Sequence, residues 1–221
     1  MQLLKASGHP GPGGEPHSAV WLQGVIDALV DLSSRDALTG LANRRSFELA
    51  LTREIDRVAR SGEPALLLVL DIDHFKRVND THGHASGDLA IRSVGRALQD
   101  TVRPMDLVAR IGGEEFAILL PNCPAAFGPQ VAERIRARVA RTRIEIQPGQ
   151  VIGVTLSVGG AFAPQWVRTT SRLWMERADL QLYRAKDGGR DCCCLEPVAV
   201  SQVSAEEKGL LFATSQFQEL T

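Results

Sequence analysis

A pair of glycines between two apolar runs constrains the fold of this chain more than any other feature of its sequence. Gly112-Gly113 separates the runs Leu107–Ile111 and Phe116–Leu120. Paired glycines between strand-like runs are typical of a tight β-hairpin, because its turn needs positive φ angles. The hairpin places Glu114 and Glu115 directly after the turn, and strand alternation predicts that they point to opposite faces.

A second acidic cluster follows another predicted strand. The apolar run Ala65–Leu70 is typical of a buried strand, and Asp71-Ile72-Asp73 closes it. Glutamates at a hairpin tip are usually only solvated, whereas carboxylates at the end of a buried strand need water, a partner or a metal. We therefore expect the two clusters to converge on one Mg²⁺ site, since Mg²⁺ prefers one or two carboxylates plus phosphate oxygens.

The bulk properties of the chain indicate one globular domain with tails. It has 221 residues, a formal net charge of -1 and 44% hydrophobic residues, which is enough for a sizeable core. This balance gives no argument for nucleic acid or a membrane surface as the main partner. The apolar runs are too short to span a bilayer. The N-terminus lacks the apolar core of a secretory signal, so we expect a cytoplasmic protein.

The cysteines and histidines do not predict a zinc site. Cys123 stands alone and Cys192–Cys194 are consecutive, and neither pattern has the spacing of zinc ligands or of a disulfide framework. We expect the triple in a short strand or tail in a reducing compartment, with a redox role as the less favoured alternative. His82 and His84 lie in a glycine-punctuated turn without a third ligand, which argues against zinc.

Helical patterns alternate with strand-like runs along the chain. Residues 1–16 are rich in glycine and proline and predict a disordered leader. In the helix predicted over 17–34, the spacing of Leu22, Val25, Leu29 and Leu32 fits either a coiled coil or a helix packed on its own domain.

The remaining elements predict the fold class. Helical periods cover Phe47–Val58, Ile91–Leu98, about Ala125–Arg141 and about Ser171–Asp187, while strand patterns cover Ala65–Asp71, the hairpin and Val151–Phe162. Asn43 is the predicted N-cap of the first of these helices, which ends at Gly62. Gly159-Gly160 inside the last strand indicates a bulge or a close backbone approach. The order predicts an α/β fold with a mixed central sheet flanked by helices; residues 196–221 are left unassigned.

Four groups of residues along the chain resemble the motifs of one family. They are, in order, Asp36–Leu41 with Asn43–Arg45; Asp71–Lys76 with Asn79-Asp80, Gly83-His84 and Gly87-Asp88; Gly112–Phe116; and Tyr183–Lys186 with Gly189-Arg190. This set resembles the GGDEF family, the diguanylate cyclases, with the signature in its GGEEF form. One departure is Asp191, where the family usually has asparagine. The resemblance implies a GGDEF domain over 35–195, with a fold similar to nucleotide cyclases and polymerase palms.

The resemblance also implies an activity. Family members condense two GTP molecules into cyclic di-GMP and release two pyrophosphates, and each domain of a homodimer holds one GTP. Mg²⁺ is the implied cofactor, with Mn²⁺ as a substitute, and Asp71, the carbonyl of Ile72 and Glu114 are its implied ligands. Glu114 and Glu115 are the implied catalytic pair: Glu114 helps to deprotonate the attacking 3′-hydroxyl, and Glu115 has a metal- or geometry-related role.

The substrate-binding residues implied by the resemblance fall into two groups. Lys76, Lys186 and Arg190 are cations suited to the β- and γ-phosphates. Asn79 and Asp88 are placed at the guanine edge, and Phe75 and His84 line the same pocket. Outside a matched motif, each of these cations would be interpreted as an ordinary surface charge.

An inhibitory site is implied just upstream of the hairpin. Arg103-Pro104-Met105-Asp106 matches the family's RxxD motif, through which cyclic di-GMP inhibits its own synthesis. A guanidinium makes bidentate contacts with phosphate or guanine, and Asp106 accepts from guanine N–H groups. Arg134 is a weaker candidate for completing the site. The alternative is a turn held by a local Arg–Asp pair, which contributes little at a surface.

Three other functions compete with cyclic di-GMP synthesis. The first is a catalytically inactive GGDEF module that senses cyclic di-GMP or GTP, although such modules usually lose a signature carboxylate or the lysine. The second is a different nucleotidyl transferase, which the pair Asn79 and Asp88 disfavours. The third is a scaffold module whose carboxylates are only solvated.

Overall fold

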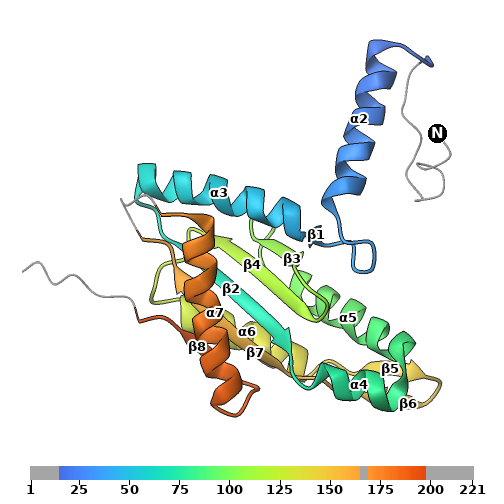
Figure 1. Ribbon diagram of the computed structural model, residues 1–221, viewed down its shortest axis with the longest axis vertical. Helices are drawn as coiled ribbons and strands as arrows, with labels where there is room; N and C mark the ends of the chain where they lie inside the picture. Colours follow the sequence, from blue (N-terminus) through green and yellow to red (C-terminus); the bar gives the residue numbers. More distant parts are fainter. Residues whose placement is uncertain (1–14, 165–168, 198–221) are drawn as a thin grey trace, which may run out of the picture.

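The computed structural model describes residues 15–164 and 169–197 (Figure 1). The leader expected over 1–16 and the tail over 196–221 lie almost entirely outside these ranges, and so does the side chain of Leu32. At the centre is a six-stranded mixed sheet, as predicted, in the order β1-β3-β4-β2-β7-β8. Its strands are β1 Ala42–Asn43, β3 Leu107–Arg110, β4 Glu115–Pro121, β2 Ala65–Ile72, β7 Leu156–Phe162 and β8 Cys193–Leu195. The pairs β1–β3 and β7–β8 are parallel and the others antiparallel.

Two hydrophobic cores cover the two faces of the sheet. All eight residues of β2 are buried, because alternate side chains enter opposite cores. Leu67 and Val69 pack with α3 (Arg44–Ser61) and α7 (Ser171–Asp187). Leu68 and Leu70 pack with α5 (His84–Gln99) and α6 (Gly128–Ala140) on the other side. The central strand therefore fixes the helices of both layers relative to its own carboxyl end.

Helix α3 forms where its caps and apolar spacing predict it. The Asn43 side chain accepts from the amide of Ser46 at 3.0 Å, and Gly62 ends the helix with a left-handed φ of 68°. The predicted apolar face is buried, namely Phe47, Leu51, Ile55 and Val58. Burial of each such side chain contributes about 1.5–3 kcal/mol to stability. These local predictions are confirmed.

Gly159 sets the distance between α7 and the sheet. A Cβ at this position would lie 2.1 Å from the amide nitrogen of Leu182 and 2.4 Å from the carbonyl oxygen of Ala178. Of the two predicted alternatives, the structure has the close backbone approach. Because these neighbours are backbone atoms, any larger residue at 159 would push α7 away from β7.

Several element boundaries differ from those predicted. The polar segment after β2 contains an unpredicted helix, α4 (Phe75–His82), and α5 begins at His84. His82 and His84 thus lie at adjoining helix ends around Gly83 rather than in a longer turn. Helix α6 begins at Gly128, three residues after the predicted start. The expectation of one strand over Val151–Phe162 is wrong: β6 (Gln150–Ile152) pairs with β5 (Ile144–Gln147) in a separate hairpin, and β7 starts afresh at Leu156.

The physical reasons are local. Helix α4 has too few apolar residues for a visible period, with Phe75 buried and Val78 partly so. In the β5–β6 hairpin, Gly149 has a φ of 79° and turns the chain. Alternation alone does not reveal that a strand ends between Ile152 and Leu156.

Helix α2 (Ala19–Ser34) projects away from the sheet (Figure 1). Ser18 caps it by accepting from the amide of Trp21 at 3.2 Å. Its apolar side chains Leu22, Ile26 and Leu29 are each about half exposed, at 49%, 52% and 47%. The helix therefore does not pack on its own domain, and its pairing with a second chain stays a prediction. No helix in the described part of the chain is long and apolar enough to cross a membrane.

Candidate active site

The two acidic clusters meet at one edge of the sheet. In the register of β2, Asp71 lies opposite Glu115 of β4 on one side and Ser157 of β7 on the other. Directly before the start of β4, the carbonyl oxygen of Glu114 accepts from the amide of Ile72 at 3.2 Å. Antiparallel pairing thus brings the end of β2 and the start of β4 together, as the sequence predicts.

Lys186 joins this edge from the last turn of α7. Its Nζ lies 2.8 Å from Oδ2 of Asp71, and the side chains are 34% and 10% exposed. Burial raises the pKa of Glu114, and the negative charges of Asp71 and Glu115 raise it further, while Lys186 opposes the rise. The edge therefore holds more negative charge than one ammonium balances.

This donor set fits a divalent cation. Asp71, Glu114 and the Ile72 carbonyl supply only oxygen atoms, which Mg²⁺ prefers, and the Lys186 ammonium already places positive charge beside Asp71. In residues 15–164 and 169–197, no three His, Cys, Asp or Glu side chains gather into a complete metal cage. Mg²⁺ usually keeps several waters and adds substrate phosphate oxygens, so it needs only a few protein ligands.

Arg110 holds the glycine turn in place. It donates to the carbonyl oxygen of Gly113 from Nε at 3.1 Å and from Nη2 at 2.8 Å, and its Nη1 lies 3.2 Å from both oxygens of Asp36. Asp36 also accepts from the amide and hydroxyl of Thr39, at 2.9 and 2.7 Å. Burial alone would raise the pKa of Asp36, but the hydrogen bonds from Thr39 and Arg110 keep it below its ordinary value. Sequence reasoning assigned neither residue this role.

Glu115 lies back against the turn. A Cβ on Gly112 would stand 2.3 Å from Oε2 of Glu115, so the first glycine leaves space for this carboxylate. Burial and then the charge of Glu115 raise the pKa of Asp179 on α7, while Arg44 lowers it. Asp179 is thus an electrostatic neighbour of the site that sequence reasoning missed.

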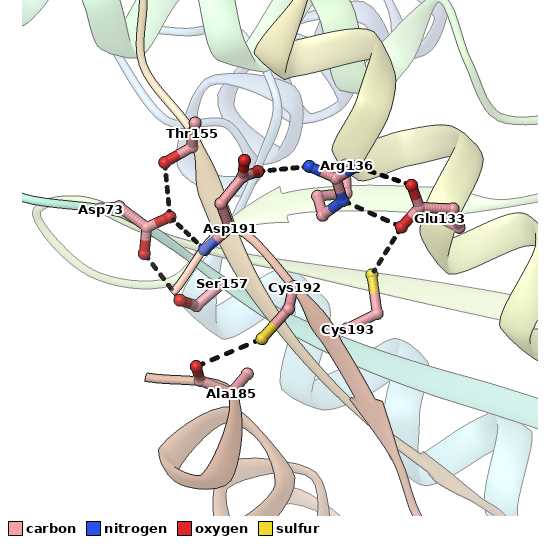
Figure 2. A network of polar contacts seen from close by, with 9 residues as sticks. All are labelled: Asp73, Glu133, Arg136, Thr155, Ser157, Ala185, Asp191, Cys192 and Cys193. Carbon is pink, nitrogen blue, oxygen red and sulfur yellow. Dashed lines mark hydrogen bonds and ion pairs between the residues drawn. The ribbon is translucent and has the colours of Figure 1, made fainter. Parts of the chain in front are cut away.

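Asp73 is buried, and its contacts are structural (Figure 2). Its Oδ1 accepts from the hydroxyl of Ser157 at 2.6 Å. Its Oδ2 accepts from the hydroxyl of Thr155 at 2.7 Å and from the amide of Asp191 at 3.0 Å. Asp73 thereby ties the end of β2 to β7 and to the loop that carries Arg190, and we do not count it among the metal ligands.

Asp191 continues this network toward α6. Its carboxylate pairs with Arg136, which also binds Glu133 through Nη2 at 2.6 Å and Nε at 2.8 Å (Figure 2). The departure from the family's asparagine is therefore matched by an arginine partner. Arg190 and Asp191 have positive φ angles of 66° and 45°, so this loop is tightly bent beside the site.

Cys193 and Cys194 lie in β8 and Cys192 directly precedes it, in line with the expected short strand. Burial and the neighbouring Glu133 carboxylate raise the pKa of Cys193 to about 12. Burial also raises the pKa of Cys192, whose thiol donates to the carbonyl oxygen of Ala185 at 3.3 Å (Figure 2). Since the thiolate is the reactive form, these environments disfavour a redox role.

The expected guanine-binding residues gather where α4 meets α5. A Cβ on Gly87 would lie 2.0 Å from Oδ1 of Asn79, so the Asn79 side chain lies across that glycine, next to Asp88. His84 and Asp88 are exposed and one turn apart on α5. Phe75 is buried below them, and Lys76 is exposed on the first turn of α4.

Arg103, Asp106 and Arg134 also come together. Oδ2 of Asp106 accepts from the backbone amide of Arg103 at 2.8 Å, so the carboxylate closes the turn through the backbone rather than through the guanidinium. Burial raises the pKa of Asp106, opposed by Arg103 and by the charge of Arg134. Nη2 of Arg134 lies 3.5 Å from the carbonyl oxygen of Thr101. Arg103 in the turn and Arg134 on α6 thus both act on the carboxylate of Asp106.

A hollow of about 600 Å³ lies between α3 and α7. Asp179 belongs to its lining, but none of the metal-, catalytic or substrate-binding residues expected from the sequence does. The carboxylates of Asp71 and Glu114 therefore do not open into this hollow.

Comparison with known proteins places the chain in a family. A family model described as diguanylate cyclase, GGDEF domain, matches residues 33–192. The chain belongs to the GGDEF family. Among its relatives, the diguanylate cyclase DgcP of Pseudomonas aeruginosa is 43% identical over 157 residues, 71% of this chain and 23% of DgcP. The probable diguanylate cyclase DgcC of Escherichia coli is 40% identical over 161 residues, 72% of this chain and 42% of DgcC. The chain thus spans less than half the length of these curated relatives.

Solved GGDEF structures share the fold. The coiled coil and GGDEF domain of DgcB from Caulobacter crescentus, solved in complex with c-di-GMP, has a TM-score of 0.74 and 33% identity, with 79% of this chain and 92% of that one covered. Diguanylate cyclase SiaD from Pseudomonas aeruginosa, solved with its activator SiaC, has a TM-score of 0.73 and 38% identity, with coverage of 79% and 66%. The GGDEF domain of this chain therefore has the mixed α/β fold of its family.

Proposed function

We propose that this chain is a diguanylate cyclase, which condenses two GTP molecules into cyclic di-GMP and releases two pyrophosphates. The observation that carries the proposal is the convergence of Asp71, Glu114 and Lys186 at the end of the central strand, with Lys186 Nζ 2.8 Å from Asp71. Membership in the GGDEF family supports it. Retention of both signature glutamates and of the lysine disfavours an inactive sensing module.

Asp71, Glu114 and the Ile72 carbonyl would hold Mg²⁺, or Mn²⁺ in its place. When bound, such a cation offsets phosphate charge and lowers the pKa of a hydroxyl that it contacts. Lys76, Lys186 and Arg190 bind the β- and γ-phosphates as charge-assisted donors. Lys186 exchanges its Asp71 partner for phosphate when the nucleotide arrives.

Glu114 helps to deprotonate the attacking 3′-hydroxyl, directly or through the cation that it would hold. A cation in contact with this hydroxyl would lower its pKa and so make the proton easier to remove. Glu115, held against Gly112, keeps the turn and the metal-binding edge in their geometry. Expulsion of pyrophosphate completes each of the two condensation steps.

Asn79 and Asp88 select guanine, with His84 and Phe75 beside them. A site with polar atoms matched to guanine rejects adenine, because its own groups would go unpaired. Gly87 maintains this arrangement by leaving room for the Asn79 side chain.

Two chains must face each other, because each domain holds one GTP. The exposed apolar side chains of α2 support a dimer formed through that helix, and the solved DgcB fragment consists of a coiled coil and a GGDEF domain. Pairing through α2 raises the effective concentration of the second half-site. Specific activity then rises with protein concentration and falls when residues 1–32 are removed.

Cyclic di-GMP binds at Arg103, Asp106 and Arg134 and inhibits the enzyme by holding the domains away from the productive arrangement. The gathering of these three residues beside one turn supports this. Arg103→Ala should relieve inhibition by added cyclic di-GMP without lowering the initial rate. Unchanged inhibition in this variant would remove the site from the proposal.

The activity is tested by incubating the chain with GTP and Mg²⁺ and separating the nucleotides by chromatography. We expect cyclic di-GMP and pyrophosphate from GTP, little product from ATP, and a blunted preference for GTP in Asn79→Ala. Equal use of ATP would contradict the guanine assignment. Binding of cyclic di-GMP without any consumption of GTP would instead indicate a sensing module.

A further inference from the structure

Four arginines line a hollow on the face of the sheet opposite α7. Arg92 and Arg96 lie one turn apart on α5, Arg138 lies in the last turn of α6, and Arg143 follows that helix. The hollow has a volume of about 370 Å³. Its lining also includes Leu89, Ser93, Ala97, Asp100 and Thr142. Two helices and the segment after α6 thus direct four cations to one small space.

Within the part of the chain that the structure describes, these arginines lack the carboxylate partners that some other arginines of the domain have. Arg57, Arg110 and Arg136 each pair with one or two carboxylates. Within the described ranges, none of the four arginines of the hollow makes an ion pair or a hydrogen bond through its guanidinium. Asp100 is the one carboxylate among the lining residues described. Four guanidinium groups and one carboxylate line the hollow, so positive charge is in excess there.

We propose that this hollow binds a small anion with two linked phosphate groups. Each guanidinium offers several donors in a fixed fork that matches phosphate oxygens, and two pairs of arginines suit two phosphates. A bound anion also relieves the repulsion among four like charges. The hollow is of small-molecule dimensions, which favours a soluble phosphate compound over an extended membrane surface.

The site is separate from those already assigned. Lys186 lies in the last turn of α7, which packs on the other face of the sheet, and Arg190 follows that helix. Arg103, Asp106 and Arg134 share no residue with the lining of the hollow. It is the placement of Arg138 and Arg143 opposite Arg92 and Arg96 that indicates a ligand. The inference does not depend on the proposed cyclase activity.

Inorganic pyrophosphate is the probe for this site. We expect isothermal titration calorimetry without Mg²⁺ to show binding that the double variant Arg92→Gln, Arg138→Gln weakens at least tenfold. The matched control is Arg53→Gln, Arg60→Gln on α3, which removes two exposed arginines elsewhere and should leave the affinity unchanged. Orthophosphate should bind more weakly than pyrophosphate.

A second background separates this site from the candidate active site. In a Lys186→Gln, Arg190→Gln chain, pyrophosphate binding that depends on Arg92 and Arg138 should persist. If pyrophosphate binding were lost in the Lys186→Gln, Arg190→Gln chain but unaffected by the Arg92→Gln, Arg138→Gln pair, it would belong to the active site. This result would overturn the proposal. Because the experiment measures pyrophosphate binding and not GTP turnover, failure of the proposed cyclase activity would leave its result unaffected.

Thermal unfolding gives a readout independent of calorimetry. Without anion, the double variant Arg92→Gln, Arg138→Gln should unfold at a temperature equal to or above that of the unmodified chain, since it removes repulsion among the four arginines. Pyrophosphate should raise the Tm of the unmodified chain and not that of the variant. A lipid headgroup is the alternative ligand. It would be favoured, and the small-molecule ligand overturned, if the chain floated with phosphatidylglycerol vesicles but not with phosphatidylcholine vesicles. This flotation would have to depend on the same arginines and to occur without pyrophosphate binding.

Discussion

Asp71 and Asp73 stand two residues apart at the end of one strand, and their surroundings differ. Asp71 has one lysine partner, on a flexible side chain that is 34% exposed. Asp73 receives three hydrogen bonds from Ser157, Thr155 and the backbone of Asp191. A carboxylate with unfilled acceptor sites can take a new ligand, whereas one whose acceptors are used by the fold holds the fold together. The comparison distinguishes a carboxylate that is available for chemistry, Asp71, from one with a structural role, Asp73, within the same motif.

The largest expected effect is on catalytic activity, when the charge of Glu114 beside Asp71 is removed. Glu114→Gln keeps the size of the side chain but removes the charge that binds a cation and the base that accepts a proton. We expect cyclic di-GMP synthesis to fall at least about 10²- to 10³-fold, with an unchanged circular dichroism spectrum. Near-normal turnover at saturating Mg²⁺ would rule out the proposed role of Glu114.

Substitution of Asp73, the structural carboxylate, should lower the stability of the fold. Asp73→Ala leaves the buried Ser157 hydroxyl and the part-buried Thr155 hydroxyl and Asp191 amide without their acceptor. Each unsatisfied buried donor costs about 1–3 kcal/mol, and a part-buried one costs less. We expect the free energy of unfolding to fall by about 3 kcal/mol, measured by urea denaturation. The matched control, Asp71→Ala, frees only the partly exposed Lys186 and should cost less than about 1 kcal/mol while abolishing activity. Equal losses of stability in the two variants would break the distinction.

A smaller effect is the contribution of Glu114 to the pH dependence of stability. Because burial and Asp71 raise the pKa of Glu114 in the folded chain, ionised Glu114 destabilises the fold at pH values above its folded pKa. In metal-free buffer, Glu114→Gln should therefore be more stable than the unmodified chain at pH 7. The difference should vanish as the pH falls below the ordinary value of 4.5, where the carboxyl is neutral in both the folded and unfolded states. A stability difference that does not change with pH would contradict this cause.

The smallest effect is expected at the outer end of the Asp73 network. Asp191→Asn keeps the backbone amide that donates to Asp73 and removes only the ion pair with Arg136, which retains Glu133. We expect a change in unfolding free energy within about 1 kcal/mol and no change in activity, as for most exposed ion pairs. A large loss of activity would show that this pair positions Arg190.

The features predicted from the sequence are those set by neighbouring residues. The hairpin around Gly112-Gly113, the Asn43 cap and the buried strand before Asp71 each depend on a few adjacent residues, and each is present. The reason given for the glycines was wrong, because neither has a positive φ; the first instead leaves room for the Glu115 side chain. The meeting of Asp71 with Glu114 was predictable because both lie at the ends of recognisable strands. The roles proposed for these residues rest on the family motifs rather than on local pattern.

The contacts that sequence reasoning missed join distant segments. Asp73 binds residues 82, 84 and 118 positions away, and Arg110 binds Asp36 over 74 positions. Local periodicity does not reveal such pairs, so only the family motif, and not the residue pattern, distinguished Asp71 from Asp73 in the sequence. Helix α4 and the β5–β6 hairpin were missed for a related reason, since both are short elements with few buried side chains.

The position of β2 in the sheet has a consequence for how the site responds to its surroundings. This strand is paired along its length on both sides, by β4 and by β7, and every one of its residues is buried. Its amides should therefore be among the slowest to exchange hydrogen with solvent, opening only when the whole domain unfolds. Local fluctuations cannot loosen the carboxyl end of such a strand without dismantling the domain. Signals that change the output of this chain should then act on how two rigid domains meet, and leave the geometry within each one untouched.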